Sequence, residues 1–175
     1  TVTTRVGIFS SRASLLTAVL LLSRMPSTAS YTFTSQAELV SAVNAWDSNA
    51  SAATATYGHI STWDTSRITN MDSLFEKKST FNDDVSSWDV SRVVHMNDVF
   101  KDATLFNQDL SSWDVGRVTA MYRMFYSATS FNQYLCWDIS GVFSSTYLMF
   151  AYSSGSEKCP STFTSKAELS TAADE

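Results

Sequence analysis

Aromatic positions recur along this chain with a fixed spacing. Tryptophans follow one another at steps of 25, 25 and 24 residues, at Trp63, Trp88, Trp113 and Trp137. Phenylalanines keep a step of 25, at Phe75, Phe100, Phe125 and Phe150, and again, each time followed by asparagine, at Phe81, Phe106 and Phe131. Self-similarity at a fixed period of this length is typical of repeat architectures. We assign the fixed apolar positions to the core and the positions that change between copies to the surface.

Each copy joins two local patterns. The stretch DVGRVTAM, residues 114–121, is short and β-branched, which is typical of a strand. The stretch MYRMFYSATSF, residues 121–131, has apolar side chains at helical spacing. One copy alone cannot bury its apolar side, whereas stacked copies can. The pattern therefore predicts a solenoid of four coils, each with a short strand and one or two helical turns.

A helical cap is expected before the first copy. Ser35 and Glu38 form a Ser-x-x-Glu capping box. The pattern predicts a helix over 35–46 and a second over 49–57. A near-copy of the cap sequence begins at Thr162. The predicted divisions are a targeting leader over 1–29, a helical N-terminal cap over 31–58, the repeat solenoid over 59–160 and the start of a second, truncated module over 161–175.

The first residues have the composition of a targeting segment. An arginine, the apolar run 15–22 and then small residues indicate a secretory signal peptide that is cleaved after Ala29. The run is shorter than the ~20 apolar residues that span a bilayer. A short buried helix and a plastid presequence are the alternatives. We expect a secreted or cell-surface protein without an integral membrane span, with a plastid or another organelle lumen as the alternative location.

The repeat also resembles a known family. The segment FNQDLSSWDVGRVTAMYRMFYSATSFNQ is similar to the BspA-type leucine-rich-repeat family, and the resemblance covers residues 60–150. That family was long catalogued as a domain of unknown function in bacterial and algal surface proteins. The resemblance implies a secreted or surface-attached protein that acts in adhesion and protein binding. The expected fold class is α/β: a right-handed solenoid of four leucine-rich-repeat-like coils of about 25 residues, with a helical N-terminal cap.

Composition and motifs argue against several functions. The 175 residues carry a net charge of −5, and the acidic repeat region lacks the clustered Lys and Arg that a nucleic-acid partner needs. His59 and His95 stand apart from metal ligands, and the many serines have no nucleophile elbow. We therefore expect a protein that is not an enzyme, without a metal site and without a cofactor.

Two polar rows have structural interpretations. Aspartate follows each tryptophan, at Asp64, Asp89, Asp114 and Asp138, and is expected to fix the bend there through an Asx turn. A Ca²⁺ site is the alternative, because Ca²⁺ favours several carboxylates. Asparagines at Asn82, Asn107 and Asn132 are expected to form an inward ladder that bonds to loop backbone rather than a ligand site.

Two covalent features depend on secretion. Cys136 and Cys159 are the only cysteines, and in a secreted chain an even count indicates a disulfide. Free buried thiols in a reducing compartment are the alternative. Asn49-Ala50-Ser51 is a glycosylation sequon at Asn49.

The variable positions after the proposed strand define a candidate binding surface, with an ordinary solvated face as the alternative for any single residue. Tyr122 and Arg123 are its best hot-spot candidates, because Tyr and Arg dominate binding energy in interfaces. The other members are Asn70, Asp72, His95, Asn97 and Asp98. We expect a non-catalytic binding or adhesion module with a protein or extended surface ligand as its partner. A glycan-, mineral- or ice-binding surface and the non-catalytic part of a larger enzyme are the alternatives.

Overall fold

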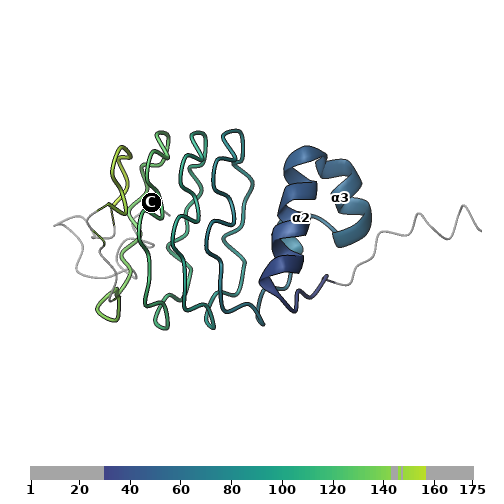
Figure 1. Cartoon of the computed structure of the whole chain (residues 1–175), viewed down its shortest axis with the longest axis horizontal. Coiled ribbons are helices and arrows are strands. Elements are labelled where there is room, and N and C mark those ends of the chain that lie inside the picture. Colours follow the sequence, from purple (N-terminus) through teal and green to yellow (C-terminus); the bar gives the residue numbers. More distant parts are fainter. Residues whose placement is uncertain (1–29, 143–145, 147, 157–175) are drawn as a thin grey trace, which may run out of the picture.

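The computed structural model describes residues 30–142, 146 and 148–156. Among these residues two helices, α2 (Gln36–Ser48) and α3 (Ala50–Tyr57), precede the short 3-10 helix η1 (Ile60–Thr62). The chain then runs through irregular loops that lie side by side in a row, with the helix pair at one end (Figure 1). We call residues 60–84 loop 1, 85–109 loop 2, 110–134 loop 3 and 135–156 loop 4.

Both helices lie where the sequence predicts them. Ser35 Oγ accepts the N–H of Glu38 at 3.3 Å, and the Glu38 carboxylate accepts the N–H of Thr34 at 3.0 Å. The Glu38 bond thus returns to the residue before the N-cap, instead of to the N-cap itself as in the usual capping box. The buried face of α2 consists of Leu39, Ala42, Val43 and Trp46. Helix α3 ends at Gly58, whose φ of 76° suits a residue without a Cβ.

Backbone hydrogen bonds join each loop to the next. Four bonds of 2.8–2.9 Å run from the N–H groups of alternate residues in 71–77 to the carbonyls of alternate residues in 95–101. The same register links 96–102 with 120–126. Several of the N–H groups in between close turns onto carbonyls three residues back, as Glu76 does onto Ser73 at 3.2 Å. Those of Asp72 and Asn97 bond to side-chain oxygens instead. Along these stretches every second N–H thus bonds to the following loop.

The predicted fold class is wrong. Within 59–156, the described residues contain no strand longer than an isolated parallel bridge and no helix apart from η1, so no solenoid of leucine-rich-repeat coils is present. Residues 121–131 have apolar side chains at helical spacing, but they form consecutive turns instead. A helix would bond every N–H to the carbonyl four residues back. Here half of the N–H groups bond to a neighbouring loop, and a helix cannot form.

Columns of phenylalanine fill the space inside the loops. Phe75, Phe100, Phe125 and Phe150 stack with centroids 5.1–5.5 Å apart and ring planes within 6° of parallel. A second column, Phe81, Phe106 and Phe131, has spacings of 5.8 and 5.9 Å. Within loops 1, 2 and 3 the two rings stack at 3.9–4.2 Å. Such pairs add about 0.5–1.5 kcal/mol each beyond the area they bury, so the columns fix the spacing of the loops.

The tryptophan row combines burial with a hydrogen bond. Trp88 Nε1 donates to the Ile60 carbonyl at 2.9 Å, and Trp113 Nε1 donates to the Val85 carbonyl at 3.1 Å. Trp137 repeats this bond to Leu110 at 3.1 Å. Each indole therefore contacts the preceding loop through its ring and through its N–H. Phenylalanine could supply only the ring, which explains why tryptophan occupies this row.

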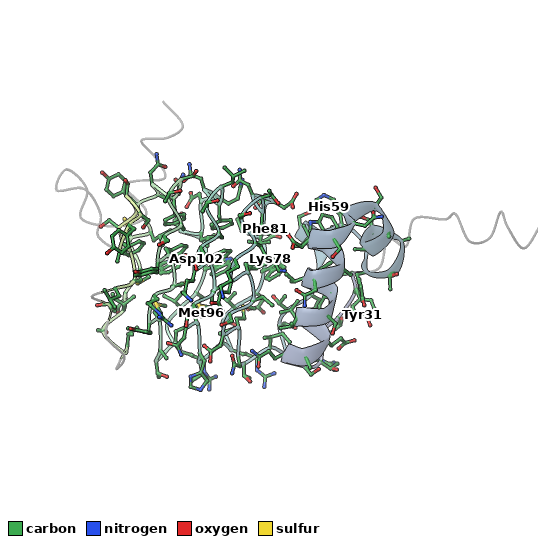
Figure 2. The ribbon with its side chains drawn as sticks, turned by 45° about the horizontal axis from the view of Figure 1, so that its top comes forward. Tyr31, His59, Lys78, Phe81, Met96 and Asp102 are labelled. Atoms are coloured by element: carbon green, nitrogen blue, oxygen red, sulfur yellow. The ribbon has the colours of Figure 1, made fainter. Side chains whose placement is uncertain are left out.

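The helix pair is fastened to loop 1 by polar contacts around an apolar centre. Trp46 Nε1 donates to Asp83 at 2.9 Å, and Gln36 Nε2 donates to the Asp72 carbonyl at 3.3 Å. Lys78, which lies on the side of loop 1 that faces α2 (Figure 2), is 3.3 Å from the Asp47 carboxylate. Gln36 thus donates to a carbonyl of loop 1, as the N–H groups of each loop donate to carbonyls of the next loop.

Candidate binding face

A residue with a side chain adopts the left-handed conformation at two positions in loops 1, 2 and 3, and at the second of these positions in loop 4 as well. The first has φ of 52–57° at Ser73, Asp98 and Arg123, and the second has φ of 56–63° at Lys77, Asp102, Ser127 and Tyr152. Left-handed backbone costs an ordinary residue roughly 1–2 kcal/mol, and glycine adopts it without that cost. None of the five glycines occupies these positions. The N–H groups of Ser73, Lys77, Asp98 and Asp102 each donate to a carbonyl of the next loop.

The side chains of these turns form one surface, which we call the turn face. It comprises residues 72, 73, 76 and 77 of loop 1 and the residues 25, 50 and 75 positions later that the structure describes. The backbone beneath it is fixed by the bonds between loops, while the side chains differ from loop to loop. The turn face is therefore a regular framework that carries a non-repeating set of groups.

Ion pairs link neighbouring loops across the turn face. Lys101 Nζ lies 2.7 Å from Glu76 Oε1, and this hydrogen bond lowers the pKa of Glu76 and raises the pKa of Lys101. Arg123 holds Asp98 at two points: Nη2 donates to Oδ2 at 3.1 Å, and Nε lies 2.9 Å from Oδ1. Both pairs hold the side chains in fixed positions and favour their charged forms.

Several predicted binding residues also serve the stack. Asp72 Oδ1 accepts the N–H of Asn97 at 2.7 Å, and Asn97 Oδ1 accepts the N–H of Tyr122 at 3.0 Å. Asn70 and His95 lie in the parallel bridges, and Asn70 Oδ1 accepts the N–H of Asp72 at 2.7 Å. The acceptor oxygens of three of these side chains are therefore engaged within the protein, which sequence comparison between copies could not show.

The structure brings Tyr122 and Arg123 together and places further tyrosines on the same face. The Arg123 guanidinium lies over the Tyr122 ring, 4.7 Å from its centroid. Tyr126 and Tyr152 meet edge to face at 5.2 Å, and Tyr152 is 72% exposed. Sequence reasoning missed Tyr126 and Tyr152. Their signal was present, because both stand at positions that vary between copies.

The aspartate and asparagine rows serve the backbone. Asp64, Asp89, Asp114 and Asp138 each accept the N–H of the residue two positions on, at 3.0–3.1 Å. This confirms the predicted Asx turns. Asn82 Oδ1 accepts the N–H of Asn107 at 2.8 Å, and Asn107 Oδ1 accepts that of Asn132 at 3.0 Å. The predicted bonds to loop backbone are thus present, but Asn82 and Asn132 are exposed, so the ladder does not point inward.

Other candidate sites carry no evident reaction chemistry. A shallow pocket of about 180 Å³ between loops 3 and 4 includes Asp114 and Asp138, whose carboxylates close the Asx turns described above. No group of three or more His, Cys, Asp or Glu in the described part of the chain is placed to hold a metal ion. His59 (Figure 2) caps η1, and its Nδ1 accepts the N–H of Ser61 at 3.3 Å.

The two predicted covalent sites differ in what the structure describes. Cys136 is disulfide-bonded, but Cys159 lies outside the described residues, so their pairing stays a prediction. Asn49 is exposed and caps α3, its Oδ1 accepting the N–H of Ala52 at 3.1 Å. The predicted leader over 1–29 and the predicted second module over 161–175 also lie outside the described residues.

Comparison with known proteins supplies the family. Residues 48–163, about two thirds of the chain, match the family described as "Mycoplasma protein of unknown function, DUF285". The chain belongs to this DUF285 family. The predicted membership of the BspA-type leucine-rich-repeat family is therefore wrong, and the activities which that resemblance implied have no support from it. No curated protein and no solved structure matches the DUF285 chain.

Among the residues that the structure describes, no helix combines the length and the apolar character needed to cross a bilayer.

Proposed function

We propose that this protein is a non-catalytic binding module, secreted or held at the cell surface, which binds a protein partner on the turn face. One observation carries the proposal: the turns keep side chains at left-handed positions where glycine would cost less. Strained backbone of this kind clusters at functional sites and persists where the surrounding structure holds it in place. The identity of these side chains changes from loop to loop, as expected of a recognition surface rather than of a structural ladder.

The chemistry of the turn face near loop 3 favours a protein partner. Tyr122, Tyr126 and Tyr152 provide rings with hydroxyl groups, and tyrosine gives large contact area at low entropic cost. Arg123 is held in place by Asp98 before any partner arrives. A preorganised side chain loses less conformational freedom on binding, so it contributes more to affinity. We place the energetic centre of the interface at these tyrosines and Arg123.

The test compares two matched double variants of the full chain. Tyr122→Ala with Arg123→Ala removes the proposed centre. Arg117→Ala with Tyr134→Ala removes the same residue types from loop 3 outside the turn face, where Tyr134 is 51% exposed. The wild-type chain is immobilised, surface proteins of the source organism are captured, and each captured protein is then titrated against all three chains.

The proposal requires that the first variant weakens binding by at least tenfold while the second binds like wild type. Circular dichroism must show that both variants are folded. Equal binding by all three chains would contradict the turn face as the binding site. A loss in the second variant alone would place the interface on another side of the stack.

A further inference from the structure

One asparagine at the junction between α2 and α3 caps both helices. Asn49 ends α2, its N–H donating to the Ala45 carbonyl, and it also begins α3 as the N-cap. Its side-chain Oδ1 accepts the N–H of Ala52 at 3.1 Å. The cap uses only the carbonyl oxygen of the carboxamide. The amide nitrogen Nδ2 has no role in holding the helix start, and the residue is exposed.

The residue two positions on is equally accessible. Ser51 is exposed, and its hydroxyl makes no hydrogen bond to the protein in the described structure. Ser48 and Thr54 on the same helix pair behave differently, because their hydroxyls bond to carbonyls four residues back at 2.8 Å. Asn49-Ala50-Ser51 is the one Asn-x-Ser/Thr sequence in the chain. The structure therefore leaves both functional groups of this sequon, the amide nitrogen and the hydroxyl, free.

We propose that Asn49 is an N-glycosylation site whose modification leaves the helix cap intact. In the transfer, Nδ2 forms a bond to the anomeric carbon of a lipid-linked oligosaccharide pyrophosphate. The bond from that carbon to the pyrophosphate oxygen breaks, and its electron pair leaves with the lipid pyrophosphate. Nδ2 loses one proton to a base. The product is still an amide, so Oδ1 remains an acceptor for Ala52 and α3 keeps its N-cap.

The site is also compatible with the proposed binding face. Figure 1 shows the α2–α3 pair at the end of the row of loops, whereas Tyr122 and Arg123 belong to loop 3. A glycan at Asn49 would thus cover the helical end and leave the turn face open. The inference rests on the secreted location in the proposed function, but it does not depend on which partner is bound.

The test uses Asn49→Asp, because aspartate caps a helix as well as asparagine but cannot accept a glycan. The full chain is expressed behind a secretory signal in eukaryotic cells, as wild type, Asn49→Asp and Ser51→Ala. Wild type should lose mass with peptide N-glycosidase F and then carry aspartate at position 49. Both variants should show no shift, and the glycosylated wild type should melt within a degree or two of Asn49→Asp, whose cap carries no glycan.

Two results would overturn the inference. One is a secreted, folded wild-type chain without a glycan, and the other is a glycosidase shift that persists in Asn49→Asp. Neither result would contradict the proposed binding face, which is tested separately with the tyrosine and arginine variants. Protein isolated from its source then shows whether the native chain carries the glycan, and an unmodified native chain would restrict the site to an unused acceptor, against the proposal.

Discussion

Glycine at a left-handed position should stabilise this protein, and Lys77 offers the cleanest case. Its φ is 62°, its side chain is 74% exposed, and its nearest charge, Glu76 Oε1, is 3.8 Å away. Lys77→Gly keeps the backbone bond to the Lys101 carbonyl and removes only an exposed side chain. Relief of the left-handed conformation is worth roughly 1–2 kcal/mol, and the added freedom of glycine in the unfolded chain costs about 0.5–1 kcal/mol. The net expectation is a gain of about 0–1.5 kcal/mol.

Urea unfolding followed by circular dichroism measures this gain. Arg92→Gly is the matched control, because Arg92 is an exposed basic residue whose φ is not positive. The control should lose stability, since it adds glycine entropy without relieving any strain. If Lys77→Gly loses as much stability as Arg92→Gly, the left-handed turn at this position is not present in solution. Side chains at this position would then not be retained for binding at a cost in backbone strain.

Four further outcomes are expected. Trp113→Ala should lower the unfolding free energy by about 3–5 kcal/mol, because it removes a buried ring and its bond to Val85, and a loss below about 1 kcal/mol in urea titration would contradict the buried row. Ser35→Ala should cost about 1 kcal/mol through loss of the α2 cap, measured by thermal melting, and an unchanged melting temperature would count against that cap. Acid should destabilise the fold, because the hydroxyl and the N–H of the serine two residues on lower the pKa of Asp64, Asp84 and Asp89 below their ordinary value of 3.8. The stability that these carboxylates contribute is present above about pH 4 and is lost as the pH falls below it. A urea midpoint that does not fall between pH 6 and pH 3 would refute this. A Cys136–Cys159 bond should add about 3 kcal/mol, and two alkylatable thiols in the unreduced protein would exclude it.

The repeat and the cap could be predicted from the sequence because their causes are local or periodic. The start of α2 depends on two nearby residues: Ser35 caps the helix, and Glu38 bonds back to Thr34. The aromatic columns follow from a constant step, so Phe100 could be assigned to the core together with Phe125. Both inferences needed only spacing and side-chain type.

The conformation within each loop could not be predicted in the same way. Met121, Met124 and Phe125 are all buried and have helical spacing, and consecutive turns bury the same positions. The choice between helix and turns is made by the neighbouring loops, which accept hydrogen bonds from alternate N–H groups. The left-handed positions could not be predicted either, because sequence signals for that conformation rest mainly on glycine and asparagine, and neither residue occupies these positions.

The candidate site was predictable in outline and not in detail. Variation between copies pointed to Tyr122 and Arg123, which the structure places in contact. It did not show that the Asn97 carboxamide accepts the N–H of Tyr122, because that bond depends on how two loops are aligned. The sequence also did not show that position 155 requires glycine, although a Cβ there would lie 2.4 Å from Phe131 Cδ1.

Scalar couplings across hydrogen bonds, measured by NMR on isotope-labelled protein, test the central claim most directly. The turn face exists only if alternate N–H groups bond to the next loop. The structure predicts a coupling between the Phe100 amide nitrogen and the Met124 carbonyl carbon, whose N–H···O bond is 2.8 Å long. A coupling from Phe100 to the carbonyl of Met96, four residues back, would show a helix in its place and would contradict the turn face.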